Sequence, residues 1–262
     1  MSRPRFAACL AAVLLAPAAA PAQTTTYAVI PSVYADAEGP GVNNVLVRHQ
    51  GSPYTAQFVY SATALATLAG TEITGLTFRS AGALPDGYPL VTTTWADYRI
   101  SIGPAVAPAA VGTVFANNFT APATLVRSGP LTVPRYAWPH TGPGPEPWGI
   151  EITFDQPYLY TGGNLSILVS HPGSDNPFFG NNLMNAAVST SPGFGVDYAA
   201  LNAPGFNAAS GAIDNFPTIL RLTGQPVPEP HFALLGAALA VLASRARHRL
   251  RQWRRPSEAP AP

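Results

Sequence analysis

The chain has 262 residues, and 10% of them are charged, against about 25% in an average globular protein. The basic residues are 14 arginines and no lysine, which excludes Schiff-base lysine chemistry, a P-loop lysine and a serine–lysine dyad. The single cysteine, Cys9, lies in an expected leader segment, so the exported chain has no thiol nucleophile, disulfide or cysteine-based metal site.

Residues 1–22 have the three parts of a secretory signal peptide. Arg3 and Arg5 supply the positive start, Phe6–Ala16 is an apolar stretch of 11 residues, and Ala20–Ala22 places small residues before the cleavage point. We therefore expect a signal helix that signal peptidase removes, followed by export of the remaining chain.

Residues 23–226 form the expected exported domain, which is long enough for one substantial core. They contain six arginines and eleven acidic residues, a net charge of −5. Binding to a nucleic-acid phosphate backbone is therefore not expected.

Strands dominate this domain, because apolar and polar residues alternate in short runs. The runs at 72–79, 97–103 and 148–154 alternate clearly, and 164–171 is more uniformly apolar, as in a strand covered on both faces. Weaker strands are expected at 44–49, 56–60, 111–115, 131–134 and 218–223.

One short helix is expected before the C-terminal tail, with Ser61 as its cap and Leu65 and Leu68 facing inward. Segment 171–217 is rich in Asn, Gly, Pro and aromatic residues, so it is either a long excursion or several very short strands. Eight or more short strands joined by Gly/Pro-rich turns predict an all-β fold, a single β-sandwich with a jelly-roll-like arrangement.

The strand expected at 148–154 contains a carboxylate, so the side chains that it turns outward bear on whether the protein could be an enzyme. It places Ile150, Ile152 and Phe154 in the core and Glu151 on the outer face, where an arginine across the sheet would pair with it. Glu151 and Asp155 share that face but lie about 13 Å apart, beyond the roughly 5–9.5 Å of glycosidase carboxylates. The sequence also lacks a G-x-S-x-G nucleophile motif. A polysaccharide-active hydrolase or lyase is therefore only the second alternative.

Two acidic residues offer a candidate calcium site. Asp36 and Glu38 cluster before a predicted strand with Asn43 and Asn44, and such oxygen ligands suit Ca²⁺. Turn chemistry alone also explains Asp and Asn there. We expect no cofactor, with calcium at Asp36 and Glu38 as the alternative.

Aromatic residues beside a Pro-rich loop offer a candidate sugar site. Tyr136 and Trp138 precede or adjoin the segment 139–147, and exposed rings there would stack on sugar faces. The alternative is that these rings pack on the prolines of their own loop. A carbohydrate-binding module for exopolysaccharide is the first alternative function.

The C-terminal tail, residues 227–262, has three parts in order. An apolar run follows a short motif, and we expect a membrane helix over residues 231–246 that spans the bilayer with some snorkelling of its flanks. An arginine-rich end, residues 245–255, should stay in the cytoplasm by the positive-inside rule, which places the domain on the far side of the inner membrane. The motif is Val227, Pro228, Glu229 and Pro230, and the arginines are Arg245, Arg247, Arg249, Arg251, Arg254 and Arg255.

This tail resembles the PEP-CTERM sorting signal of bacterial exosortase substrates. The resemblance implies recognition by a membrane-embedded exosortase, transient anchoring, processing near the triplet, and release to the cell surface or to the extracellular matrix of a biofilm. The order of a short helix and the strands at 72–79, 97–103 and 148–169 resembles an exported domain that recurs with such tails, which implies fold and export but no activity. We therefore expect a secreted, non-enzymatic protein; a plain tail anchor is the alternative for residues 227–262.

Overall fold

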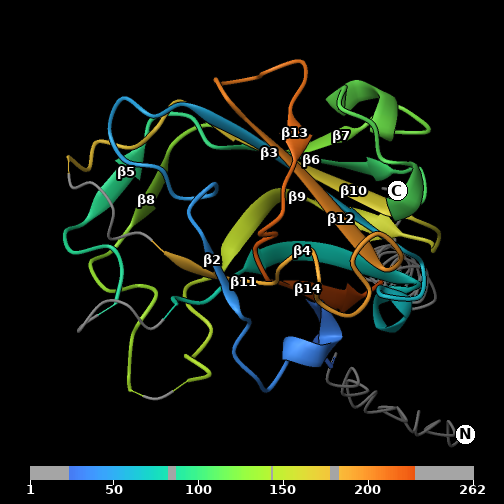
Figure 1. Ribbon diagram of the computed structural model, residues 1–262, viewed down its shortest axis with the longest axis horizontal. Helices are drawn as coiled ribbons and strands as arrows, with labels where there is room; N and C mark the ends of the chain where they lie inside the picture. The colour runs from blue at the N-terminus through green and yellow to red at the C-terminus, as the bar shows by residue number, and fades with distance from the viewer. Residues whose placement is uncertain (1–23, 82–86, 143, 178–182, 228–262) are drawn as a thin grey trace, which may run out of the picture.

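Antiparallel strands make up the fold in a computed structural model of the chain, which describes residues 24–81, 87–142, 144–177 and 183–227 (Figure 1). The expected signal segment 1–22 and residues 228–262 of the expected tail lie outside the described residues. The strands are β1 (Thr26–Ile30), β2 (Gly41–Asn43), β3 (Tyr54–Tyr60), β4 (Thr71–Thr77), β5 (Thr93–Trp95), β6 (Arg99–Pro104), β7 (Thr124–Arg127), β8 (Leu131–Val133), β9 (Ile152–Tyr160), β10 (Leu165–His171), β11 (Met184–Ala186), β12 (Tyr198–Pro204), β13 (Ala212–Ile213) and β14 (Leu220–Pro226). The helical elements in these residues are short 3-10 turns: η1 (Ser32–Tyr34), η2 (Ala66–Leu68), η3 (Pro108–Ala110) and η4 (Phe115–Asn118).

The larger sheet has six strands in the order β13-β12-β3-β10-β6-β7. β10 lies inside it, so that Ile167 is paired with Phe58 of β3 on one side and with Ile102 of β6 on the other. Six of the seven residues of β10 are buried. The prediction from the uniformly apolar run at 164–171, a strand covered on both faces, is therefore confirmed.

The smaller sheet has four strands in the order β1-β14-β4-β9. Thr26 of β1 pairs with Gly224 of β14, so the first and last described strands are neighbours. Along another edge, β9 of this sheet packs against β7 of the larger one, where the Gln156 side-chain amide donates to the carbonyl of Leu125. Two further pairs of short strands, β2 with β11 and β5 with β8, lie outside the main sheets.

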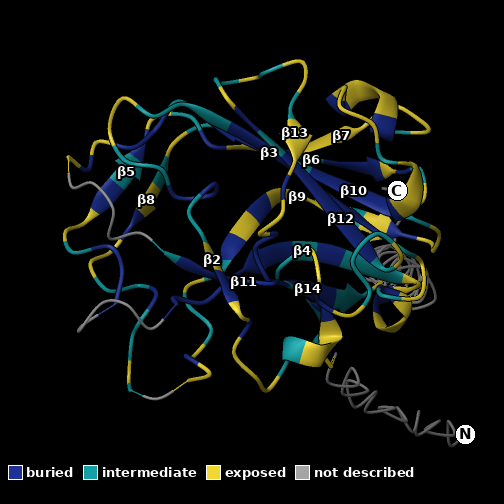
Figure 2. Cartoon of the chain, viewed as in Figure 1, coloured by how far each residue is buried: buried dark blue, intermediate teal, exposed yellow. Residues whose placement is uncertain are grey.

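One hydrophobic cluster joins the two main sheets. Ile100 and Ile102 reach it from the larger sheet, and Leu76 and Leu222 reach it from the smaller one, all of them fully buried. Burial of apolar surface contributes about 25 cal/mol per Å², so this shared cluster is the main source of stability. Figure 2 shows the same pattern, with β3, β10 and β12 dark blue along most of their length. The expected all-β class is confirmed.

Residues 45–47 are buried but belong to no strand, so the strand predicted at 44–49 is wrong. Their carbonyls instead accept hydrogen bonds from three buried side chains. The bonds run from His171 Nε2 to Val45 (3.0 Å), from the Tyr98 hydroxyl to Leu46 (3.1 Å) and from the Tyr88 hydroxyl to Val47 (3.2 Å). Because a buried carbonyl without a partner costs free energy, these donors let an irregular segment lie in the core.

The helix predicted after Ser61 is only the single turn η2. Ser61 Oγ accepts a hydrogen bond from the backbone N–H of Ala64 at 3.1 Å, as a capping residue does. Leu65 and Leu68 are fully buried, so their predicted orientation is confirmed. Gly70 follows with a φ of 78°, a left-handed conformation that stops a helix.

The strand predicted at 148–154 begins only at Ile152, as β9. Ile152 is 1% exposed and Phe154 is buried, as expected, but Ile150 is 40% exposed, so its assignment to the core is wrong. The reason is that a side chain takes the place of a backbone partner. The buried Thr77 hydroxyl donates to the carbonyl of Ile150 at 2.9 Å, and the chain leaves the regular sheet there.

One further predicted strand is wrong, and the open choice for segment 171–217 is decided by the structure. Segment 111–115 is not a strand, and η3 and η4 flank and enter it instead. Segment 171–217 contains the short strands β11 and β13 and also β12, whose seven residues pair with β3 in the larger sheet.

Every arginine of the described residues lies over an aromatic ring. A guanidinium is planar and stacks on rings, which the compact ammonium group of lysine does not do equally well. The domain therefore uses arginine as a flat packing group. The pairs, with distances from the guanidinium carbon to the ring centroid, are Arg48 on Tyr54 (4.2 Å), Arg79 on Trp148 (4.9 Å), Arg99 on Phe206 (5.0 Å), Arg127 on Tyr98 (5.9 Å), Arg135 on Tyr136 (4.1 Å) and Arg221 on both Tyr27 (4.8 Å) and Trp148 (5.0 Å).

Candidate functional site

Trp138, which the sequence suggested as a sugar-facing ring, is fully buried. It stacks on Phe78, with ring centroids 4.7 Å apart, and on Tyr88, at 5.8 Å. Gly149 makes this position possible, because a Cβ there would lie 2.0 Å from Trp138 Cδ1. The expectation for Trp138 is therefore wrong: its Pro-rich neighbourhood indicated a surface loop, but the ring turns into the core.

Tyr136 is half-buried and is not brought together with Trp138 as a binding surface. Its φ is 60°, and the guanidinium of Arg135 lies 4.1 Å from its ring centroid. Arg135 also donates a hydrogen bond to the Tyr136 hydroxyl. One face of this ring is thus covered by the neighbouring residue of its own loop, and the second expected ring, Trp138, is buried elsewhere, so the two do not form a stacking surface for a sugar.

Asp36 and Glu38 are exposed and lie around the buried guanidinium of Arg79. Burial lowers the pKa of Arg79, and the charges of both carboxylates act in the opposite direction. Glu38 Oε1 also accepts a hydrogen bond from Asn185 Nδ2 at 3.1 Å. The described residues contain no group of three His, Cys, Asp or Glu side chains suited to a metal ion. Arg79 supplies a positive charge at this place, and calcium binding there stays a prediction.

Two side-chain pairs could suggest catalysis. His140 Nδ1 lies 2.5 Å from Glu146 Oε1, and the buried Glu146 also accepts the backbone N–H of Thr141 at 2.7 Å. Ser52 Oγ lies 2.9 Å from His49 Nε2, within a turn closed by the Ser52 N–H and the His49 carbonyl. Each pair is explained by its own turn, so neither gives a reason to propose an enzyme.

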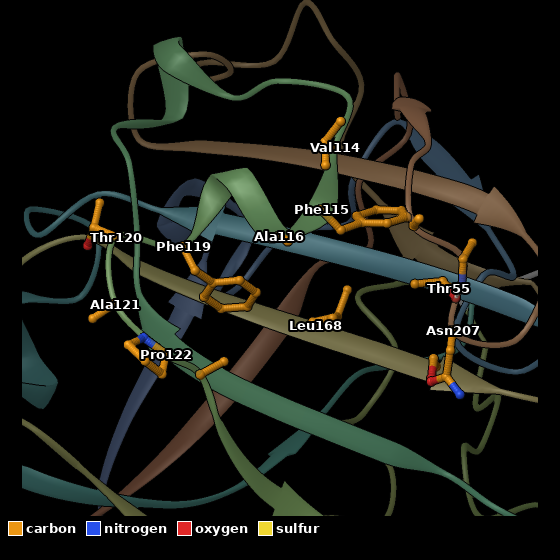
Figure 3. Close-up of a pocket in the computed structure, with 14 residues that line it drawn as sticks. Thr55, Val114, Phe115, Ala116, Phe119, Thr120, Ala121, Pro122, Leu168 and Asn207 are labelled. Atoms are coloured by element: carbon orange, nitrogen blue, oxygen red, sulfur yellow. Dashed lines mark hydrogen bonds between the residues drawn. The ribbon is translucent and has the colours of Figure 1, made fainter.

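An open groove of about 620 Å³ lies on the outer face of the larger sheet (Figure 3). Its described lining residues carry no ionisable group. Leu168 of β10 forms the floor, with the ring of Phe119 to one side and Asn207 on the other. Asn207 Oδ1 accepts a hydrogen bond from the Ser170 hydroxyl at 2.8 Å. The volume is in the range of small-molecule pockets, and this lining suits an uncharged, mainly apolar group rather than a reacting one.

A second cluster lies on the outer face of the smaller sheet, formed by Tyr27, Trp148, Glu151, Arg221 and Thr223; we call it the outer-face cluster. The Arg221 guanidinium lies between the rings of Tyr27 and Trp148, and Glu151 Oε2 accepts a hydrogen bond from the Thr223 hydroxyl at 2.6 Å. Tyr27 is 50% exposed. Two rings, a guanidinium, a carboxylate and a hydroxyl are the groups with which proteins bind polar ring molecules.

Sequence analysis did not find the outer-face cluster. Tyr27 is exposed, Val29 is partly buried, and Ala28 and Ile30 are buried, which is the alternation of a strand over a run of only five residues. Glu151 was expected to pair with an arginine across the sheet and instead accepts a hydrogen bond from Thr223. Tyr27 lies on β1 and Arg221 and Thr223 lie on β14, so the pairing of β1 with β14 brings Tyr27 to Arg221. Trp148 and Glu151 come from the segment before β9, and no local spacing in the sequence indicates that these residues meet.

Of the expected sorting residues, Val227 is described, exposed and directly follows β14. Pro228, Glu229, Pro230 and the six arginines from Arg245 to Arg255 lie outside the described residues. Within the described part of the chain, no helix has the length and hydrophobicity needed to cross a membrane.

Comparison with known proteins gives no relatives for this chain. No protein-family model, no curated protein and no solved structure matches it. Function must therefore be argued from the residues of the chain itself.

Proposed function

We propose that this chain is an exported, non-enzymatic protein that an exosortase-type enzyme sorts to the cell surface or extracellular matrix. The observation that carries the proposal is the C-terminal order of Pro-Glu-Pro triplet, apolar run and arginine cluster, combined with a signal peptide at the other end. Such a protein would be anchored in the inner membrane for a time and then released.

The fold is compatible with this route. We propose that the two sheets around one core form a β-sandwich of jelly-roll type. Thr26 pairs with Gly224, so the two ends of the domain leave the fold side by side, next to the positions where both proteases would act. The domain lacks cysteine and therefore folds without disulfide formation after export.

A second Pro-Glu-Pro triplet, residues 145–147, provides an internal comparison. Its Glu146 is 2% exposed and bound to Thr141 and His140. It lies inside the folded domain and precedes no apolar run, so we propose that only the triplet at 228–230 acts in sorting.

The test is to change Pro228, Glu229 and Pro230 together to Ala and to follow the protein through membrane and secreted fractions. The wild type should be shortened and released, while the variant should stay full-length in the inner membrane. A matched control changes Pro256, Glu258 and Pro260 to Ala, beyond the arginine cluster, and should be released normally. Release of the first variant at the wild-type rate would disprove exosortase sorting.

A second candidate function is carbohydrate binding, for which the outer-face cluster is the specific observation. Tyr27 is half exposed beside a guanidinium and a carboxylate that form no ion pair with each other. A matrix protein with such a surface would attach to polysaccharide.

A further inference from the structure

We propose that the outer-face cluster binds an uncharged sugar unit of a polysaccharide, holding two neighbouring hydroxyl groups between Arg221 and Glu151. This inference rests on the carbohydrate-binding candidate and adds to it the site and the chemical class of the ligand. Its basis is a positioned donor group and a positioned acceptor group that the fold brings close but does not join.

Arg221 is the donor. Its guanidinium lies 4.8 Å from the ring centroid of Tyr27 and 5.0 Å from that of Trp148, so two rings fix its orientation. Its Nε is buried and has no hydrogen-bond partner in the described part of the structure. Arg221 as a whole is only partly buried, so the terminal nitrogens of its guanidinium, rather than the buried Nε, are the donors that a ligand would meet.

Glu151 is the acceptor. The Thr223 hydroxyl donates to its Oε2 at 2.6 Å, which orients the carboxylate along the sheet. Gly75 leaves the room for it, because a Cβ at that position would lie 2.4 Å from Glu151 Oε1. Oε1 is the carboxylate oxygen that we assign to a hydroxyl group of the ligand.

The two groups interact without touching. Arg221 and Thr223 lie two residues apart on β14 and so share one face of the sheet, and Thr223 donates to Glu151, so both charged groups lie on that face. In line with this geometry, the charge of Glu151 partly opposes the lowering of the Arg221 pKa that burial causes. The ion pairs of the described residues do not include this one, so no direct contact closes the space between the groups. Two adjacent hydroxyls can bridge such a space, one accepting from the guanidinium and the other donating to the carboxylate.

The same geometry selects against an acidic sugar. A uronate would bring its negative charge next to Glu151, and the whole domain already carries a net charge of −5. A neutral pyranose meets one positive and one negative group and can lay an apolar face on the exposed ring of Tyr27.

The experiment is isothermal titration of the purified full-length chain in detergent with soluble polysaccharide probes. The neutral probes are glucan, mannan and galactan fragments, and the acidic probe is an alginate fragment. We expect binding to at least one neutral probe and none to alginate. Tyr27→Ala and Arg221→Lys should each weaken that binding about tenfold or more, because stacking and the oriented donors are lost.

Matched controls separate binding from folding. Arg48→Lys removes another arginine stacked on a tyrosine, and Phe216→Ala removes another ring that is about half exposed. Both should bind like the wild type, and all four variants should keep the melting temperature of the wild type within a few degrees. If the wild type binds no neutral probe, the carbohydrate function itself is disproved. If it binds and the Tyr27 and Arg221 variants bind equally well, or if alginate binds best, the proposed site and ligand are wrong.

Discussion

The Nε2 atom of His171 lies 3.0 Å from the carbonyl oxygen of Val45, deep in the core of the domain. The backbone N–H of Gly173 donates to the other ring nitrogen, Nδ1, at 3.1 Å. Nδ1 therefore carries no proton, and the neutral ring donates from Nε2 to Val45. The ring also stacks on Tyr98, with centroids 5.6 Å apart, so His171 is a structural residue that holds segment 45–47 in the core.

The first prediction concerns the effect of acid. Burial lowers the pKa of His171 from 6.5 to about 4. Above pH 6.5 the ring is neutral in both states; as the pH falls from 6.5 toward 4 the unfolded chain takes up a proton that the folded chain does not. The folded state should therefore lose up to about 3 kcal/mol of stability across this window, and no more from this group below it.

Urea unfolding at several pH values measures this loss. The His171→Gln variant keeps a donor for Val45 but cannot titrate, so the difference between the wild-type and variant stabilities should shrink steadily as the pH is lowered from 6.5 to 4. An unchanged difference over that range would mean that His171 is not the buried neutral group described here.

The second prediction concerns Arg79, which is 1% exposed. Its Nη2 donates to the carbonyl of Tyr34 at 2.6 Å and its Nε donates to Asn185 Oδ1 at 3.3 Å. Lysine cannot make both bonds at once, so Arg79→Lys should lower the free energy of unfolding by about 3 kcal/mol. The exposed Arg135 is the matched control, and Arg135→Lys should cost less than about 1 kcal/mol by the same urea measurement. Equal costs would show that the bonds of Arg79 contribute nothing to stability.

The third prediction uses two isoleucines of one segment. Ile152 is 1% exposed, so Ile152→Ala should cost about 2–5 kcal/mol through lost burial and the cavity that remains. Ile150 is 40% exposed, and the same substitution there should cost less than about 1 kcal/mol. Thermal melting of both variants shows which substitution destabilises the domain more. A larger effect at position 150 would mean that Ile150 is a core residue, as simple alternation predicts, and would contradict a β9 strand that begins only at Ile152.

The fourth prediction concerns the domain as a unit. Because β1 pairs with β14 and one cluster joins both sheets, residues 23–226 should fold without the rest of the chain. The far-UV circular dichroism spectrum should be that of a β protein and should not change on addition of a thiol reductant, since the only cysteine is Cys9. A shorter form that ends at residue 219 lacks β14 and should be unfolded. A folded shorter form would mean that the central position of β14 in the smaller sheet is not needed.

The sequence by itself determined those parts of the fold where local pattern and burial agree. Alternation at 97–103 puts Tyr98, Ile100 and Ile102 on one face, and all three are buried; the uniform run at 164–171 correctly indicated a strand covered on both faces. Period-two alternation is a property of the strand itself, so it can be read without knowing the partner strands. The same reasoning gave the all-β class.

Tertiary structure decided the features that depend on distant partners. Segment 45–47 looks like a strand, yet Tyr88, Tyr98 and His171 satisfy its carbonyls in place of a neighbouring strand. Trp138 stands in a loop that reads as exposed, yet the space above Gly149 admits it to the core.

The outer-face cluster shows the same limit for function. Tyr27 and Arg221 are 194 positions apart in the chain and become neighbours only because β1 pairs with β14. No spacing within the sequence predicts the contact between these two residues, because long-range strand pairing depends on how all the strands together bury their apolar faces. The proposed destination of the protein therefore rests on the sequence of its two ends, and its candidate binding surface is found only in the folded sheet.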